Sequence, residues 1–117
     1  MGKYAVILHA MPNDSGRATH GLLYTKDLHE AGHEVILIFD GAGTTWIREY
    51  SKPEHKRHAL FEELKRLGLI AGACEYCAVS FEVYDEVEAA DISFLGEYEG
   101  HPSISELIAD GYTILTL

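Results

Sequence analysis

Basic residues are scarce in this sequence, which has 9 Lys and Arg against 19 Asp and Glu and a formal net charge of −10. Proteins that bind nucleic acids or anionic membrane surfaces depend on cationic side chains, so this balance argues against both as partners. No apolar run approaches the ~20 residues that a membrane-spanning helix needs. The first residues, Met1–Tyr4, lack the apolar stretch of a secretory signal.

Cysteine is equally sparse. The chain has 2 cysteines, which are too few for a disulfide-stapled scaffold, and a reducing, cytoplasmic location is therefore the default expectation. Linkers, repeats and low-complexity segments are also absent. We therefore expect residues 1–117 to form a single α/β domain that is large enough to bury a core of its own.

What the sequence does contain is a regular alternation of strand and helix signals. The apolar runs Tyr4–His9 and Glu34–Phe39 are typical of strands that are buried on both faces. Further strands are expected at 69–73, 91–95 and 112–117, and helices at about 15–31, near Trp46, from Ser51, over 78–90 and from Ser103. This order predicts a three-layer α/β/α sandwich with a five-stranded, mainly parallel sheet, a flavodoxin-like architecture.

Two of these helices are predicted from capping-box spacing, Ser51 with Glu54 and Ser103 with Glu106. The first is expected to end at Gly68 and to bury one apolar stripe, Ala59, Leu60, Leu64 and Leu67. The 78–90 segment is interpreted as one helix with a break near Asp85.

Chemically useful side chains follow several of the expected strands. In a parallel sheet, ligands and reactive groups collect where the strands end. His9, Asp40, Cys74 and the Gly96-Glu97 pair stand at such ends, so they are expected to share one rim.

The two cysteines form a Cys74-x-x-Cys77 pair directly after the third expected strand. If a helix begins there, its free N–H groups and partial positive charge favour the thiolate, which is the reactive form of cysteine. Glu75 acts in the opposite direction, because a neighbouring negative charge disfavours the thiolate.

Four interpretations of this pair are open. Both thiols can be small core residues, since free cysteine is often buried. A thioredoxin-type oxidoreductase would need a cis-proline before a later strand, whereas Pro102 precedes a helix. A structural zinc site needs four ligands, so histidines from elsewhere or a symmetry mate would have to complete it. The fourth interpretation, which we favour, is a persulfide carrier that accepts and passes on a sulfane sulfur by exchange at sulfur.

The order of elements also resembles the DsrE-like (DsrE/DsrF, TusD-type) sulfur-relay family over nearly the whole chain. The most specific feature is a cysteine immediately after the third strand, the place at which sulfur-transferring members carry the persulfide. The other matching segments are Lys3–His9, Ser15–Ala18, Leu28–Val35 and Phe39–Gly41. Members often have an Arg-Gly pair after this cysteine, and this chain has neither residue there.

The resemblance implies that Cys74 bears the persulfide, that Cys77 is a resolving or second thiol, and that no cofactor or metal takes part. It also implies a homo-oligomer, a trimer or hexamer, whose partners are sulfur donor and acceptor proteins or small polysulfides. His9 and Asp40 are expected as neighbours of the thiols. The alternative is a non-catalytic oligomeric module of the same fold, which binds a small ligand or a partner protein and whose cysteines only pack.

Overall fold

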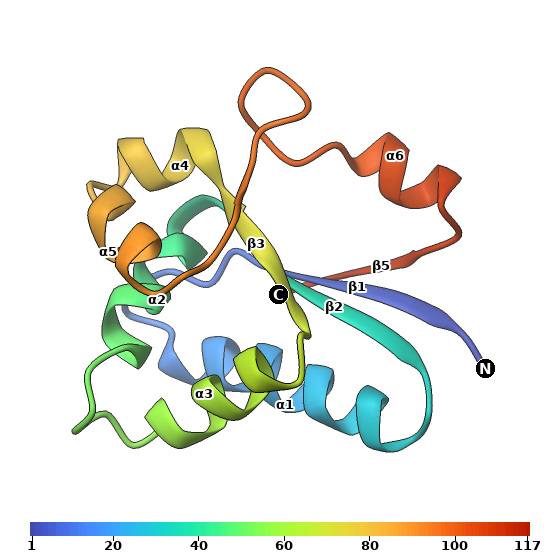
Figure 1. Ribbon diagram of the computed structural model, residues 1–117, viewed down its shortest axis with the longest axis horizontal. Coiled ribbons are helices and arrows are strands. Elements are labelled where there is room, and N and C mark those ends of the chain that lie inside the picture. Colours follow the sequence, from blue (N-terminus) through green and yellow to red (C-terminus); the bar gives the residue numbers. More distant parts are fainter.

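A computed structural model describes residues 1–117 as one five-stranded sheet with helices on its sides (Figure 1). The strands are β1 (Lys3–Leu8), β2 (Glu34–Phe39), β3 (Ile70–Cys74), β4 (Phe94–Leu95) and β5 (Thr113–Thr116). Their order across the sheet is β4-β3-β2-β1-β5, and every neighbouring pair is parallel. The predicted three-layer α/β/α sandwich is therefore confirmed, with a sheet that is parallel throughout.

The helices are distributed unevenly over the two faces of the sheet. They are α1 (Ser15–Glu30), the 3-10 turn η1 (Gly41–Thr44), α2 (Thr45–Tyr50), α3 (His58–Arg66), α4 (Glu75–Ser80), α5 (Tyr84–Ala89) and α6 (Ile104–Ala109). In Figure 1, α1 and α3 lie below the sheet, whereas α6 lies above it, beside β1 and β5. The thicker layer is thus built by α1 and α3.

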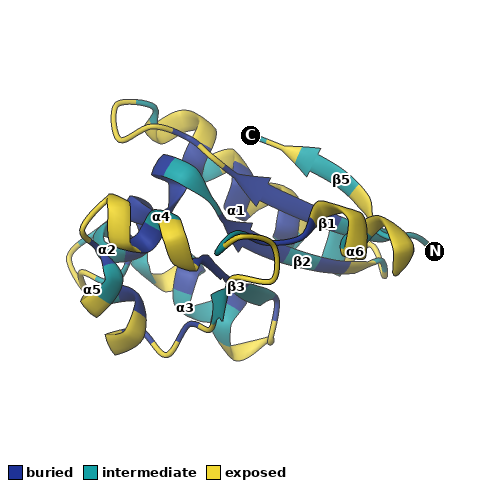
Figure 2. Cartoon of the chain, turned by 90° about the horizontal axis from the view of Figure 1, so that it is seen from above, coloured by how far each residue is buried: buried dark blue, intermediate teal, exposed yellow.

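The main hydrophobic core lies between the sheet and this thicker layer. Because side chains alternate along a strand, Val6 and Leu8 of β1 point into this core, and both are fully buried. The ring of Phe61, from α3, fills the space beneath Phe39 and Tyr50, with ring centroids 6.2 Å and 5.7 Å away. Figure 2 shows the buried residues concentrated in the central strands.

Two sequence signals fix the place where β2 ends. The Asp40 carboxylate accepts a hydrogen bond from the Gly41 N–H at 2.8 Å and so caps η1. Gly43 then allows η1 to lie directly against the end of β1, since a Cβ at this position would collide with the backbone oxygen of Leu8. Asp40 is thereby held at the carboxyl rim of the sheet.

The predicted helix start at Ser51 is wrong. The Ser51 hydroxyl donates a hydrogen bond to the Ile47 oxygen at 2.6 Å, so Ser51 ends α2 rather than opening the next helix. Residues 51–57 form turns, and α3 begins only at His58. The buried residues of α3 are Phe61 and Leu64, so only Leu64 of the predicted stripe is fully buried.

The segment after β3 is interrupted once, as predicted, but at a different place. A helix over 78–90 with a break near Asp85 was expected, and the chain forms α4 and α5, separated by residues 81–83. The interruption falls at Glu82, whose φ of 58° lies in the left-handed region, and not near Asp85. β4 is likewise shorter than the expected 91–95 and keeps only Phe94 and Leu95.

The remaining boundaries agree with the sequence patterns to within one or two residues. Asp14 caps α1 by accepting the Arg17 N–H at 3.2 Å, and Ser103 caps α6 by accepting the Glu106 N–H at 3.3 Å. None of the helices is both long and apolar enough to cross a bilayer.

Candidate functional site

The ends of β1, β2 and β3 bring together most of the side chains that the sequence placed at one rim. Cys74 is the last residue of β3, and its backbone turns directly into α4, which carries Cys77 one turn further on. Asp40 follows β2, the strand next to β3. The Cys77 thiol lies 3.8 Å from Asp40 Oδ1, so β2 and β3 contribute to one cluster.

A residue that the sequence reasoning missed completes this cluster. His101 Nδ1 lies 3.1 Å from Cys74 Sγ and 3.9 Å from Cys77 Sγ. Taking one donor atom from each side chain, those of Asp40, Cys74, Cys77 and His101 all lie within 4.8 Å of one another. We call these four residues the thiol cluster.

His9 lies at the edge of the thiol cluster and not inside it. Its Nε2 is 3.3 Å from Asp40 Oδ2, on the side of the carboxylate away from Cys77. The predicted adjacency of His9 and Asp40 is present, but the contact of His9 with the thiols runs through Asp40. His9 is therefore placed to orient the carboxylate.

His101 is delivered by the loop between β4 and α6, residues 96–103, which projects at the top of Figure 1. At its tip, Tyr98 and His101 pair through two backbone hydrogen bonds of 2.8 Å each. The two residues between them, Glu99 and Gly100, have φ values of 49° and 84°, as in a type I′ turn. This turn fixes the direction in which His101 leaves the loop.

Contacts with β3 and α4 hold the 96–103 loop over Cys74. The Gly100 oxygen accepts the Tyr76 N–H at 2.9 Å and lies 3.8 Å from Cys74 Sγ. The Tyr76 ring packs against the His101 ring with a centroid distance of 4.8 Å. At the base of the loop, the Glu97 carboxylate accepts N–H groups from both Gly96 and Ser103.

The two thiols consequently differ in access to solvent. Cys74 has 0% of its surface exposed, whereas Cys77 is half-buried. A hollow of about 430 Å³ runs along the outer side of α4 and includes Tyr76 and Gly100 in its lining. Tyr76 and Gly100 also contact the 96–103 loop and Cys74, so the hollow reaches residues that cover the buried thiol.

The protonation state of Cys74 differs from the sequence-based expectation. The pKa of the Cys74 thiol is raised to about 12, mainly by burial and to a smaller extent by contacts with Cys77 and Asp40, although the hydrogen bond from the Cys77 N–H, 3.4 Å away, lowers it. The place of Cys74 at a helix N-terminus suggested a thiolate, whereas its raised pKa favours the protonated thiol while the 96–103 loop covers it. With the thiol protonated, its S–H can donate to His101 Nδ1.

The environment of Asp40 favours the charged form of its side chain, unlike that of Cys74. Burial alone would raise the pKa of its carboxyl group, but the hydrogen bonds from His9 and from the Gly41 N–H lower it below the usual value, as does the charge of His9. Asp40 is thus a carboxylate near neutral pH. The thiol cluster combines one fixed anion, two thiols and one imidazole, a set suited to thiol exchange or to binding a soft metal ion.

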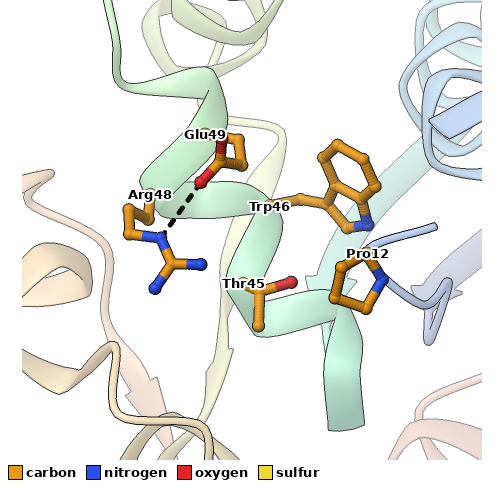
Figure 3. Close-up of a pocket in the computed structure, with 5 residues that line it drawn as sticks. All are labelled: Pro12, Thr45, Trp46, Arg48 and Glu49. Carbon is orange, nitrogen blue, oxygen red and sulfur yellow. Dashed lines mark hydrogen bonds and ion pairs between the residues drawn. The ribbon is translucent and has the colours of Figure 1, made fainter. Parts of the chain in front are cut away.

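A second hollow at the carboxyl rim has none of the residues of the thiol cluster in its lining. It has a volume of about 190 Å³ and lies between Pro12 and the first residues of α2 (Figure 3). The Trp46 indole N–H already donates to the Ala10 oxygen at 3.0 Å, and Arg48 pairs with Glu49 at 3.0 Å. The lining contains neither a thiol nor an imidazole, and the Thr45 hydroxyl already donates to the Ala42 oxygen at 2.7 Å.

Comparisons with known proteins agree with this fold. The chain is 30% identical over 98 residues to an uncharacterised protein of Methanocaldococcus jannaschii, covering 84% of this chain and 78% of that protein. A solved structure of a conserved protein of unknown function from Bacteroides thetaiotaomicron, 21% identical, matches with a TM-score of 0.67 over 98% of this chain and 94% of that chain. The DsrE/DsrF-like family model matches residues 2–117. The chain therefore belongs to the DsrE/DsrF-like family.

Proposed function

We propose that this protein handles sulfane sulfur, which it carries as a persulfide on Cys74 with Cys77 as the second thiol. Membership of the DsrE/DsrF-like family supports a role in sulfur relay. The observation that carries the proposal is the 3.1 Å contact between Cys74 Sγ and His101 Nδ1, beside a second thiol. It pairs a nucleophile with a base, which is the arrangement that sulfur exchange requires.

Loading begins when Cys74 gives its proton to His101 Nδ1 and attacks the outer sulfur of a donor persulfide. One S–S bond forms between Cys74 and that sulfur, and the S–S bond of the donor breaks. The donor leaves as a thiolate and takes the proton from His101, so no net oxidation or reduction occurs. A small polysulfide can serve as donor in the same way.

His101 has a defined task because Cys74 is protonated at rest. Burial raises the pKa of Cys74 to about 12, so thiolate is scarce at neutral pH. A base at hydrogen-bond distance removes the proton during the attack and avoids the need for a preformed thiolate. We propose that this imidazole activates Cys74 in the absence of the arginine that members of the family often have after the cysteine.

Unloading can follow two routes that differ in the role of Cys77. An acceptor thiolate can attack the outer sulfur of the Cys74 persulfide and leave Cys74 as a thiolate. Alternatively, Cys77 attacks the inner sulfur, hydrosulfide leaves, and the pair becomes a disulfide. In the second route the sulfane sulfur gains two electrons from the thiols, and a dithiol reductant has to restore them.

Access to Cys74 requires the 96–103 loop to move. The loop is held by backbone and ring contacts to Tyr76 and by the two hydrogen bonds at Glu97. Residues 97–99 are exposed and make no contribution to the hydrophobic core. A partner that displaces the tip can therefore uncover Cys74 without disturbing the sheet.

The test is sulfur loading of the full chain with inorganic polysulfide, with a metal chelator present. Intact mass and peptide mapping should find one added sulfur atom per chain, on Cys74. The Cys77→Ser variant should keep this adduct, and the Cys74→Ser variant should lose it. An absent adduct, or one that persists in Cys74→Ser, would overturn the proposal and favour a binding module whose cysteines only pack.

A further inference from the structure

The thiol cluster has the composition of a metal site as well as that of a sulfur relay. The sequence supplied only two neighbouring ligands, Cys74 and Cys77, which is too few for structural zinc. The fold adds Asp40 from the end of β2 and His101 from the 96–103 loop. Four donor atoms of three chemical types thus converge from three separate segments of the chain.

The spacing of these atoms suits a tetrahedral ion. Bonds of about 2.3 Å to sulfur and about 2.0–2.2 Å to nitrogen or oxygen place tetrahedral zinc donors roughly 3.3–3.8 Å apart. The distance from His101 Nδ1 is 3.1 Å to Cys74 Sγ and 3.9 Å to Cys77 Sγ. Asp40 Oδ1 lies 3.8 Å from Cys77 Sγ, and no pair of the four donors exceeds 4.8 Å. The distances of 3.1, 3.8 and 3.9 Å lie within a few tenths of an ångström of the expected spacing, and the most widely separated pair would have to close by up to about 1 Å.

Three of the four donors are already oriented by a neighbour. Asp40 is held by His9 Nε2 at 3.3 Å and by the Gly41 N–H at 2.8 Å, a histidine–carboxylate arrangement like those that support metal ligands. Cys74 Sγ accepts the Cys77 N–H at 3.4 Å. His101 is fixed by the turn at the loop tip and by the Tyr76 ring.

We propose that Asp40, Cys74, Cys77 and His101 bind one divalent, thiophilic cation of the zinc class in a four-coordinate site. Two sulfur donors exclude Mg²⁺ and Ca²⁺, which take oxygen ligands, and the accompanying nitrogen and oxygen suit zinc. With all four positions filled by protein, the metal has no open position for a substrate. The bound ion therefore masks both thiols.

Binding is balanced by proton release. Both cysteines coordinate as thiolates, so the protons of the two thiols leave to solvent, while Asp40 is already ionised. One dication with two thiolates and one carboxylate leaves a net charge of −1 on the site. Metal uptake therefore strengthens as the pH rises. It also competes with sulfur loading, a consequence that rests on the proposed function, whereas the metal site itself does not.

The experiment titrates the full chain, stripped with a chelator and kept reduced by a phosphine, with Zn²⁺ and separately with Co²⁺. We expect one metal per chain after desalting, measured by elemental mass spectrometry. Co²⁺ should give the intense visible bands of a tetrahedral thiolate site. Less than stoichiometric retention, or the weak spectrum of six-coordinate Co²⁺, would overturn the proposal.

Variants from two separate elements test the ligand set. Asp40→Asn and His101→Gln should each weaken Zn²⁺ binding at least about 100-fold, and His9→Gln, which only orients Asp40, about 10-fold. His20→Gln changes an exposed histidine of α1 outside the cluster and should bind as the parent chain does. Unchanged affinity in both Asp40→Asn and His101→Gln would overturn the four-residue site. Melting curves of the metal-free variants check that each is folded.

Alkylation and sulfur loading of the same protein distinguish the metal site from the proposed function. Zinc-loaded chains should resist alkylation at both cysteines until a chelator is added, whatever their response to polysulfide. A chain that binds zinc but takes up no sulfur would retain the metal site and overturn the relay. A chain that takes up sulfur but retains no metal would overturn the metal site and leave the relay in place.

Discussion

The part of this chain up to Tyr50 has a more regular structure than the part after Cys74. We call these two parts the regular half and the irregular half. Up to Tyr50, a 16-residue helix and two six-residue strands pack into a continuous core, and β1 is fully buried from Ala5 to Leu8. After Cys74, each of the three helices has six residues, β4 has two, and α6 and β5 contain no fully buried residue. The three non-glycine residues with positive φ, Glu82, Asp91 and Glu99, all lie in this second region.

This difference separates the support of the thiol cluster from its moving part. Asp40 is anchored by the regular half, at the end of the central strand β2, and Cys74 by the neighbouring strand β3. His101 comes from an exposed loop in the irregular half. Such loops open at low free-energy cost, while buried strands open only on global unfolding. A relay site needs both properties, because the nucleophile has to stay in place while its cover moves.

The largest effect should come from the main hydrophobic core, which the regular half of the chain shares with α3. Phe61 is fully buried against Phe39 and Tyr50, so Phe61→Ala leaves a large cavity and should lower the free energy of unfolding by about 3–5 kcal/mol. Phe81, which is 40% exposed between α4 and α5, is the matched control, and Phe81→Ala should cost about 1 kcal/mol or less. Urea denaturation measures both. Equal losses would mean that the two regions do not differ as described.

The next largest effect concerns the base beside Cys74. His101→Gln keeps a polar side chain but removes the imidazole, and sulfur loading of Cys74 from polysulfide at neutral pH should slow about 100-fold or more. The rate is followed by mass spectrometry with a chelator present. His20→Gln should load at the parental rate. Loading by His101→Gln at that same rate would remove the base from the mechanism.

The regular half was largely predictable from the sequence, since buried strands and capped helices leave local signals. β2 was predicted at its observed bounds, and the thiol pair was placed correctly at the end of β3. The predicted proximity of His9 to Asp40 followed from the rule that neighbouring parallel strands end at one edge.

The irregular half was less predictable because its structure depends on long-range contacts. His101 lies on a loop with no periodic pattern, and only its place shortly after the fourth strand, between Gly100 and Pro102, hinted at the rim. The raised pKa of Cys74 also has a tertiary cause. The thiol is buried by the loop oxygen of Gly100, which no local feature of the Cys-x-x-Cys pair announces.

The raised pKa of Cys74 makes the free energy of unfolding depend on pH. The unfolded thiol ionises near pH 8.5, whereas the folded Cys74 keeps its proton up to about pH 12. The unfolded state then holds fewer protons than the folded state, so the free energy of unfolding falls with rising pH. The slope is at most about 1.4 kcal/mol per pH unit from about pH 8.5 upward.

Urea denaturation between about pH 8.5 and 10 isolates the contribution of Cys74. Cys74→Ser should lose this slope, while Cys77→Ser should keep it. Burial also raises the pKa values of Tyr50 and Tyr112, and they add a slope of the same sign only at higher pH. A slope that survives in Cys74→Ser would place the responsible group elsewhere.

The smallest stability effect should come from the tip of the 96–103 loop. Gly100 has a φ of 84°, and a Cβ there would lie 3.4 Å from the Tyr76 Cβ, so Gly100→Ala strains the turn that covers Cys74. A residue with a side chain costs about 1–2 kcal/mol in this left-handed conformation. Because the loop can relieve the strain by opening, the cost falls on the cover and not on the sheet. Alkylation of Cys74 should therefore become faster.

Gly32→Ala is the matched control, because Gly32 has a φ of 91° after α1 with nothing within 4 Å of an added Cβ. It should lose a similar free energy of unfolding and leave the alkylation of Cys74 unchanged. Peptide mapping of iodoacetamide adducts on both thiols measures the rates, and in the parent chain Cys77 should react before Cys74. Faster alkylation of Cys74 in both variants would mean that it becomes accessible by general loosening of the fold. Acceleration in Gly100→Ala alone would identify the loop as the cover that a sulfur donor has to displace.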